Sequence, residues 1–239
     1  MRMAGRRGRT PSLSGPVPGF VLFDIPADMK SPVVSIVVPM YNAEKTIRKC
    51  LGSIPDRPDV QVVIVDDAST DGCASIASDF CLSRKSQDIR MVRLSENSGE
   101  GAARNKGMSL CLGEYIHSLD SDDWLIDGVY DKVVDSLPGC AADIVYIDLE
   151  VNDGSVIRLN ASTKHTYCAF QTKFIRRSLT TGLRCREVKE VGIDLTYNEE
   201  LQSLPHTEKF TGIAAYHYNF PRVGSMLWNL NNGKGYNEP

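Results

Sequence analysis

Along the chain, short runs of apolar residues alternate with segments in which apolar residues recur at helical spacing. This pattern predicts strands followed by helices. The β-branched run at residues 33–38 is typical of a strand buried on both faces of a parallel sheet. Pro39 is expected to end this strand. Apolar residues then recur at helical spacing between 47 and 54, and Asn42 is the predicted N-cap of that helix.

The same alternation continues along the chain to about residue 148. Strands are expected at 60–65, 89–94, 115–119 and 143–148, and helices are expected to end near 84, 112 and 137. Beyond residue 151 the pattern weakens, although Gly154 suggests a hairpin turn and residues 213–218 a late strand. This order predicts an α/β fold with an open, mostly parallel sheet, whose ligands bind at the carboxyl ends of the strands.

Composition and charge narrow the classes of function. The formal net charge is -3, which disfavours a nucleic-acid partner, because phosphate-backbone binders need clustered Lys and Arg. The seven cysteines form no CxxC pair, so free thiols are expected. Apolar runs stay far below the roughly 18 residues of a membrane span. Residues 1–28 resemble a basic, flexible tail, with attraction to anionic lipid as the alternative.

Two polar turns follow the first two strands. Pro39, Tyr41 and Asn42 put an aromatic ring beside a helix start, where a flat base could stack. Asp66 and Asp67 come directly after a buried strand, where a carboxylate can accept a hydrogen bond from a pyrimidine N3–H or a ribose hydroxyl. The alternative is a set of ordinary turns and helix caps, which leaves two adjacent carboxylates without a structural need.

Two further turns complete the candidate site. The glycine-rich segment 97–107 leads into a helix that carries Arg104, so backbone N–H groups and a guanidinium offer an anion site. Asp120, Asp122 and Asp123 follow the strand at 115–119. Hard carboxylate oxygens this close suit Mg²⁺ or Mn²⁺ on a diphosphate. The alternative, an N-cap for the next helix, accounts for only one of the three carboxylates.

Taken in order, the segments PMYN, DDASTDG, NSGEGAARNKG and LDSDDW resemble glycosyltransferase family 2 over residues 33–137. The resemblance implies a GT-A fold, a Rossmann-like three-layer sandwich with a small acceptor-side C-terminal region. It implies that Tyr41 stacks on the donor base, that Asp67 binds uracil or ribose, and that Arg104 orders the diphosphate site. Asp120 and Asp122 would then bind Mn²⁺ or Mg²⁺.

The likeness extends into the second half of the chain. Residues 173–179 look like the acceptor-side helix of the family, and residues 216–226 like the segment that closes over the donor phosphates. Residues 192–198 resemble the GEDxxF segment, which makes Asp194 the catalytic general base. Ile193 stands where the family has Glu. A helix cap is the alternative reading of Asp194.

The resemblance implies an inverting glycosyltransferase of polysaccharide or cell-envelope biosynthesis. Its donor would be a nucleotide-diphosphate sugar, with UDP first, and its acceptor a hydroxyl of a glycan or lipid-linked glycan. We expect a tail at 1–31, a nucleotide-sugar half at 32–150, an acceptor-side half at 151–228 and a second tail at 229–239. The expected location is cytoplasmic or peripheral at the inner membrane surface. A non-catalytic nucleotide-sugar binder or degraded scaffold is the alternative function.

Overall fold

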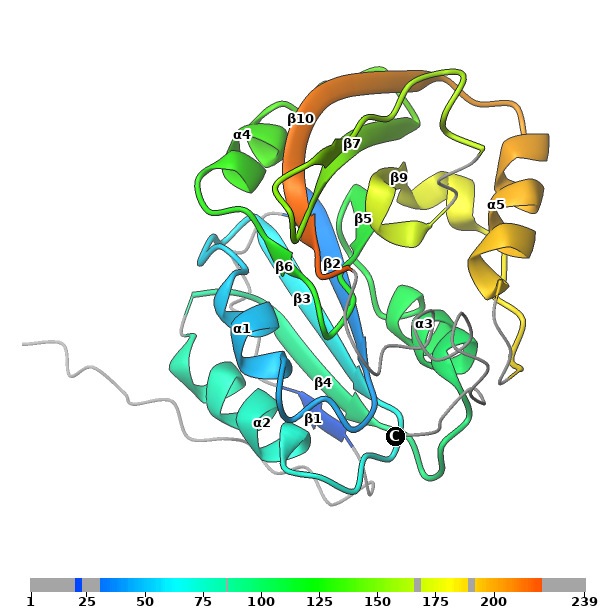
Figure 1. Cartoon of the computed structure of the whole chain (residues 1–239). Coiled ribbons are helices and arrows are strands. Elements are labelled where there is room, and N and C mark those ends of the chain that lie inside the picture. Colours follow the sequence, from blue (N-terminus) through cyan, green and yellow to red (C-terminus); the bar gives the residue numbers. More distant parts are fainter. Residues whose placement is uncertain (1–19, 23–30, 85, 166–168, 189–191, 221–239) are drawn as a thin grey trace, which may run out of the picture.

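The computed structural model describes residues 20–22, 31–84, 86–165, 169–188 and 192–220 (Figure 1). Their strands join one sheet, in the order β1-β4-β3-β2-β5-β9-β7-β10-β6, with β8 paired to β7. The strand bounds are β1 Phe20–Leu22, β2 Val34–Met40, β3 Val60–Asp66, β4 Ile89–Arg93, β5 Tyr115–Ser118, β6 Trp124–Leu125, β7 Ile144–Val151, β8 Val156–Ile157, β9 Lys173–Arg176 and β10 Glu208–Tyr218. Strand β1 lies within the segment expected to be a tail and pairs antiparallel with β4.

The central strands β4, β3, β2 and β5 are parallel to one another, as the alternation of strands and helices predicted. Every residue of β2 and β3 is buried, which is why both strands are almost continuously apolar. The second half of the chain adds the antiparallel strand β9 between β5 and β7, and the parallel pair β7 and β10. The α/β fold with its open sheet is therefore confirmed.

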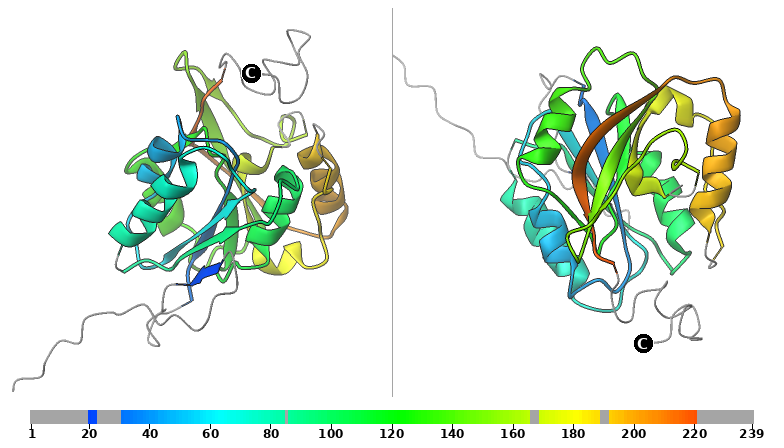
Figure 2. Two further views of the ribbon diagram at one scale, coloured as in Figure 1. Left: turned by 90° about the horizontal axis from the view of Figure 1, so that it is seen from below. Right: turned by 45° about the horizontal axis from the view of Figure 1, so that its top comes forward.

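Helices cover both faces of this sheet, so the protein has three layers (Figure 2). The helices are α1 Ile47–Gly52, α2 Cys73–Ser83, α3 Glu100–Met108, α4 Val129–Asp135 and α5 Ile193–Ser203, with 3₁₀ turns η1 Phe170–Thr172 and η2 Arg177–Thr180. Alternate residues of β2 face opposite layers. Ile36 packs in the cluster that includes α1, α2 and α4, while Val37 packs against α3.

Two expectations about the first strand are wrong. Strand β2 continues through Pro39 to Met40, because its pairing with β5 ends at Val37 and the missing N–H of proline lies beyond that ladder. Asn42 does not cap a helix either. It has a φ of 48°, and α1 begins only at Ile47, with Thr46 as its N-cap.

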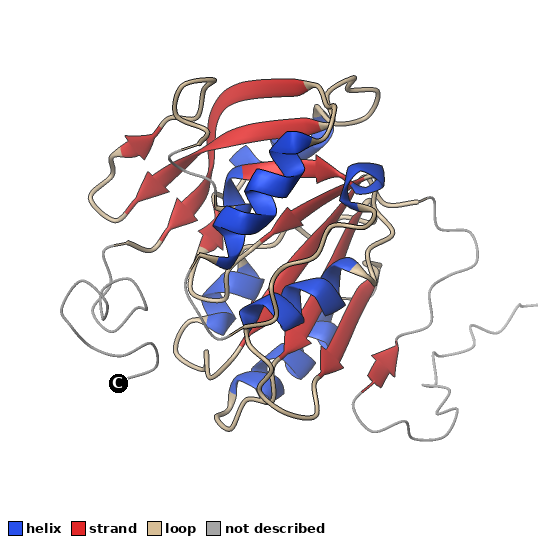
Figure 3. Cartoon of the chain, turned by 90° about the vertical axis from the view of Figure 1, so that its right-hand side faces the viewer, coloured by secondary structure: helices blue, strands red, loops and turns tan. Residues whose placement is uncertain are grey.

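The segment expected to be an acceptor-side helix is instead a strand followed by a 3₁₀ turn. Residues 173–176 form β9, which fills the gap between β5 and β7, and residues 177–180 form η2. The predicted hairpin at Gly154 is present, with a φ of 81°, between β7 and β8. Figure 3 shows β7 and the long, curved β10 side by side at one end of the sheet.

Among the described residues, the chain has no helix that is both long enough and apolar enough to cross a membrane.

Candidate functional site

The polar turns predicted from the sequence meet at one edge of the sheet, at the carboxyl ends of β2, β3 and β5. The backbone N–H of Asn42 donates to Ser69 Oγ at 3.0 Å, and Thr70 N–H donates to Asn42 Oδ1 at 2.8 Å. Asn42 therefore ties the turn after β2 to the turn after β3. Pro39 is buried, and the neighbouring Tyr41 is 41% exposed, so its ring is available to a ligand at this edge.

The two adjacent aspartates after β3 are buried and have separate partners. Asp66 Oδ1 accepts from Ser69 N–H at 2.9 Å, and Asp66 Oδ2 lies 3.0 Å from Arg93 Nη1. Asp67 accepts from the backbone N–H groups of Ser98 at 2.7 Å and Gly99 at 2.8 Å, one at each oxygen. Asp67 thus fixes the glycine-rich turn against β3. Each oxygen keeps a second lone pair for a ligand.

Arg104 lies at the centre of the site and is almost fully buried. Its guanidinium donates to Glu100 one turn earlier on α3, to Ser118 Oγ at the end of β5, and to Asp120 Oδ1 at 2.6 Å. Burial opposes the charge of Arg104, but Asp120 and Glu100 outweigh that effect and raise its pKa above the usual value. Arg104 is therefore a fixed cation that holds two carboxylates at this edge.

The acidic run after β5 forms a tight turn that leads into β6, not into a helix. Asp123 N–H donates to Asp120 O at 3.0 Å, and α4 begins only at Val129. The helix-cap alternative for these aspartates is therefore wrong. Asp123 is buried, while Asp120 and Asp122 are partly exposed.

Strand β10 holds this acidic turn from the other side. Tyr216 O–H donates to Asp123 Oδ2 at 2.7 Å, and Asn219 N–H donates to Asp123 Oδ1 at 2.8 Å. Asn219 Nδ2 also donates to Asp122 O at 3.0 Å. Burial, followed by repulsion from Asp120 and Asp122, raises the pKa of Asp123 to about 8. Asp123 is thus an internal anchor of the turn, whereas Asp120 and Asp122 are only partly buried.

Asp194 comes to the same edge from α5. It lies in the first turn of that helix, behind Gly192 as the N-cap residue, so it is not itself the cap. Burial raises the pKa of Glu100, and repulsion from Asp120 and Asp194 adds to the increase while Arg104 opposes it. Glu100 is therefore bonded to Arg104 and lies within electrostatic range of both Asp120 and Asp194.

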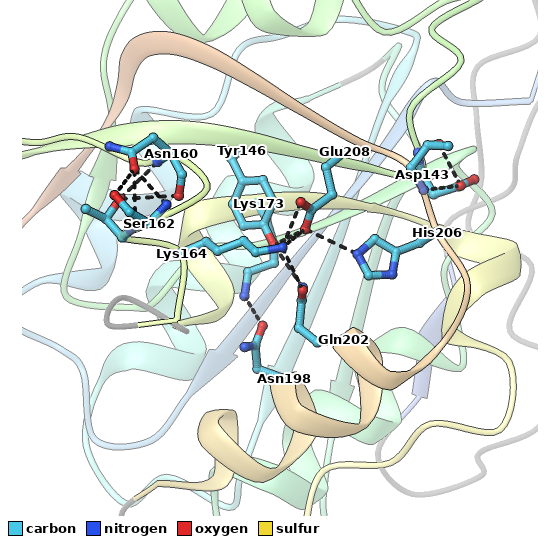
Figure 4. A network of polar contacts seen from close by, with 12 residues as sticks. Asp143, Tyr146, Asn160, Ser162, Lys164, Lys173, Asn198, Gln202, His206 and Glu208 are labelled. Carbon is cyan, nitrogen blue, oxygen red and sulfur yellow. Dashed lines mark hydrogen bonds and ion pairs between the residues drawn. The ribbon is translucent and has the colours of Figure 1, made fainter.

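Two sets of contacts hold α5 and the segment before it in place. Lys173 on β9 is buried and donates to Asn198 Oδ1 at 2.7 Å, one turn after Asp194. Figure 4 shows this contact beside the bonds of Gln202 with Tyr146 and with Lys164. Buried polar contacts of this kind fix the position of a helix. The site is therefore shaped by the second half of the chain as well as the first.

Asn105, which follows Arg104 on α3, clamps the segment that precedes α5. Its Nδ2 donates to Cys185 O at 2.9 Å, and Cys185 N–H donates back to Asn105 Oδ1 at 2.8 Å. The backbone of α3 lies so close to that of residue 186 that a Cβ on Gly101 would be 2.0 Å from Arg186 O. Only glycine fits at position 101.

Within the described residues, no three His, Cys, Asp or Glu side chains converge as a ready metal cage. Asp120 and Asp122 nevertheless offer hard carboxylate oxygens on one exposed turn, which fit a Mg²⁺ or Mn²⁺ ion that takes its remaining ligands from a diphosphate. His217 is not part of such a site. Its ring nitrogens bond Glu150 and Asn152, and its ring stacks on Trp124.

Sequence reasoning missed several residues that build this edge. Glu100 resembled an ordinary first-turn acid, which the helix dipole favours in any case. Tyr216 and Asn219 fall in residues 216–226, the segment that resembles the one closing over the donor phosphates in the family. No local pattern linked these two residues to the acidic turn. Most of that segment, residues 221–226, lies outside the described residues.

Comparison with known proteins adds a family to this geometry. Residues 35–200 match the model of "Glycosyl transferase family 2". The chain is 35% identical over 128 residues to the "Putative teichuronic acid biosynthesis glycosyltransferase TuaG" of Bacillus subtilis (strain 168), a match that covers 52% of the chain and 50% of that relative. Other curated relatives are spanned over as little as 15% of their length.

Solved structures show the same fold. S. aureus TarS 1-349 in complex with UDP-GlcNAc superposes with a TM-score of 0.68 at 21% identity, over 82% of this chain and 63% of that one. The mannosyltransferase PcManGT from Pyrobaculum calidifontis, in complex with GDP-Man and Mn²⁺, gives 0.65 at 18% identity, over 92% and 65%. At these identities the likeness concerns the fold alone.

Proposed function

The chain belongs to glycosyl transferase family 2, and from this premise we propose that it moves a sugar from a nucleotide-diphosphate sugar to a hydroxyl of a glycan or lipid-linked glycan. The transfer inverts the configuration of the anomeric carbon in one direct displacement. The observation that carries the proposal is the Arg104 cluster, in which one buried cation holds Glu100 and Asp120 at the carboxyl edge of the sheet.

The donor would lie across the turns after β2, β3 and β5. The exposed ring of Tyr41 offers a stacking surface for the base, and Pro39 and Asn42 hold the turn that presents it. Asp66 and Asp67 are fixed at the end of β3, where Asp67 can accept from the base or the ribose. This arrangement follows the rule that open α/β sheets bind ligands at the carboxyl ends of their strands.

The diphosphate would lie between Arg104 and the acidic turn. Asp120 and Asp122 would hold a Mn²⁺ or Mg²⁺ ion, which neutralises charge on the departing nucleoside diphosphate. Arg104 fixes the carboxylate of Asp120 at 2.6 Å, so the turn is oriented before the donor binds. Asp123, bonded by Tyr216, keeps the turn from opening.

Asp194 would act as the general base that takes the proton of the acceptor hydroxyl as its oxygen attacks. Its place in the first turn of α5 and its electrostatic effect on Glu100 support this role. Ile193, which replaces the acid usual in the family, is buried. Glu100, on the facing helix α3, supplies an acidic neighbour from another part of the chain.

The ligands of two similar structures and the name of one relative guide the choice of donor and setting. TarS was solved with UDP-GlcNAc and PcManGT with GDP-Man and Mn²⁺, while TuaG is named for teichuronic acid biosynthesis. We take a UDP-sugar as the first donor to test, and a cell-envelope glycan precursor as the acceptor class. The proposed location is the cytoplasm or the inner membrane surface.

A donor screen tests this function. The full chain is mixed with UDP-, GDP- and dTDP-sugars, with and without Mn²⁺, and the thermal midpoint and the release of nucleoside diphosphate are measured. We expect one nucleotide class to raise the midpoint in the presence of Mn²⁺ and to be released. Asp122→Asn should lose the Mn²⁺-dependent part of binding. Binding without release in any acceptor mixture would favour a non-catalytic binder, and the absence of both would contradict the proposal.

A further inference from the structure

A polar pocket lies at the C-terminal end of α3. It has a volume of about 300 Å³ and is bounded by the last turn of α3, by η2 and by the loop that follows. Helix α3 begins at Glu100, beside Arg104, and ends at Met108, which lines the pocket. Met108 lies one turn after Arg104, about 6 Å along the helix axis, so the pocket adjoins the candidate site but is lined by other residues.

Two arginines line this pocket, and each is held by one backbone bond. Arg177 Nε donates to Gly113 O at 2.9 Å, and Arg184 Nη1 donates to Leu183 O at 2.9 Å. Among residues 31–220 as far as they are described, no carboxylate lies within ion-pair distance of either guanidinium. Arg177 also acts on the nearby thiol of Cys111, where its positive charge partly offsets the rise in pKa that burial causes.

This lack of an acidic partner is unusual within the molecule. The chain is acidic overall, and other described arginines such as Arg57, Arg93 and Arg176 each contact at least one carboxylate. An arginine that is anchored but not neutralised keeps most of its N–H donors for a ligand. Two of them on one pocket produce a local positive field.

The remaining lining of the pocket is also suited to an anion. Ser178 and Thr181 also line the pocket, and its described lining residues include no Asp or Glu. A hydroxyl can donate to an anionic oxygen, and a guanidinium can bind a phosphate through two parallel N–H groups. The pocket therefore offers donors from Arg177, Arg184, Ser178 and Thr181, and none of its described lining residues carries a negative charge that would repel an anion.

We propose that this pocket binds a phosphate group, carried either by a small phosphorylated molecule or by a lipid headgroup. Arg177 and Arg184 donate charge-assisted hydrogen bonds to the phosphate oxygens, and the hydroxyls of Ser178 and Thr181 donate further hydrogen bonds. The volume exceeds that of a phosphate alone, so the group to which the phosphate is attached has room in the pocket. The proposal does not depend on the activity proposed for the donor edge.

Binding of inorganic phosphate to the full chain tests the site. Titration calorimetry is performed at constant ionic strength, set with sodium chloride, and without nucleotide, because a nucleoside diphosphate is itself a small phosphorylated molecule. We expect the double variant Arg177→Gln/Arg184→Gln to bind phosphate at least about tenfold more weakly, because two charge-assisted contacts are lost. Arg158→Gln is the matched control, since Arg158 is an exposed arginine that does not line the pocket, and its affinity should not change.

Vesicles distinguish the two sources of phosphate. The same proteins are floated with phosphatidylglycerol vesicles and with phosphatidylcholine vesicles. Recruitment to the anionic vesicles that the double variant loses identifies a lipid headgroup, whereas phosphate binding without recruitment identifies a small molecule. If the double variant misfolds, Arg184→Gln alone keeps the Arg177 bond to Gly113 and should still weaken binding about threefold.

Two results would overturn the proposal. One is phosphate or vesicle binding that the arginine substitutions leave unchanged, because the ligand would then be elsewhere. The other is that the wild-type chain binds neither inorganic phosphate nor anionic vesicles.

Discussion

The hydroxyl of Tyr216 joins both ends of the acidic turn: it donates to Asp123 Oδ2 at 2.7 Å and accepts from the backbone N–H of Asp120 at 3.1 Å. Tyr216 is on β10, more than ninety residues later in the chain, and it is fully buried. The turn that would carry the metal is therefore shaped by a strand from the second half of the chain.

Tyr216→Phe removes the hydroxyl and both of its hydrogen bonds but keeps the aromatic ring. Asp123 and the N–H of Asp120 each lose a partner, and a buried group left unsatisfied costs about 1 to 3 kcal/mol. We expect a loss of unfolding free energy in that range. Mn²⁺-dependent donor binding should also be weaker, because the turn that carries Asp120 and Asp122 is no longer fixed in position. Urea unfolding and donor titration with and without Mn²⁺ measure the two effects.

Tyr115→Phe is the matched control for this experiment. Tyr115 is equally buried, and its hydroxyl donates to Ala142 O at 2.6 Å, away from the acidic turn. It should lose stability to a similar extent and keep its donor affinity. If both variants lose the same donor affinity, Tyr216 acts only through general stability and not by positioning the turn.

Asp194→Asn tests the proposed general base. The amide has the shape of the carboxylate but cannot take a proton, so turnover should fall by roughly a hundredfold to ten thousandfold while donor binding is retained. Glu199→Gln is the control, since Glu199 is an exposed acid on the same helix. Initial rates at saturating donor and the dissociation constant for UDP are the measurements. Unchanged turnover in Asp194→Asn would remove this residue from the mechanism.

The central sheet and the position of its site could be predicted because both depend on local patterns. Buried parallel strands can be recognised in the sequence as runs of β-branched residues. Once β2, β3 and β5 are parallel, the polar turns that follow them must meet at one edge of the sheet. Pro39 misled the prediction, because its effect depends on whether β5 still pairs beside it, and the sequence of β2 does not contain that information.

The supports of the site could not be predicted, because they depend on contacts between distant segments. Asn219 meets Asp123 across 96 positions, and Asn105 meets Cys185 across 80. Glu100 has the pattern of any acid in the first turn of a helix, and only the fold shows that Arg104 joins it to Asp120. The helix expected at 173–179 rested on the family resemblance alone, and residues 173–176 instead form β9 between β5 and β7, where pairing with both strands decides the structure.

The contact between Asn105 and the backbone of Cys185 gives a further prediction. Asn105→Ala leaves both the N–H and the C=O of Cys185 without their partner in a buried position, which should lower the unfolding free energy by about 1 to 3 kcal/mol. Amide hydrogen exchange at residues 185–188 should also become faster, since this segment then opens locally. Ser109→Ala, which removes an exposed hydroxyl bond within the same region, should leave exchange at 185–188 unaltered. Slow exchange in Asn105→Ala would show that other contacts hold the segment.

The buried, neutral ring of His117 leads to a prediction about how the free energy of unfolding depends on pH. Its ring is fully buried between Tyr130 and Phe174, with Nε2–H donating to Gln171 O at 3.0 Å and Nδ1 accepting from Tyr130 O–H at 2.9 Å. Both nitrogens are thus matched to the neutral ring. Burial lowers the pKa of His117 from the usual 6.5 to about 4, despite the opposing effects of Gln171 O and Asp120.

Because the unfolded chain binds a proton at His117 below pH 6.5 and the folded chain does not until about pH 4, acid favours unfolding across this window. The stability that the neutral ring contributes is complete above pH 6.5 and falls by about 3 kcal/mol as the pH approaches 4. Urea unfolding at pH 7, 6 and 5 measures the slope. His117→Phe should be less stable at pH 7 but show a shallower loss toward pH 5, whereas His165→Gln, at an exposed position, should keep the wild-type slope. Equal slopes in the wild type and His117→Phe would mean that other groups govern acid unfolding.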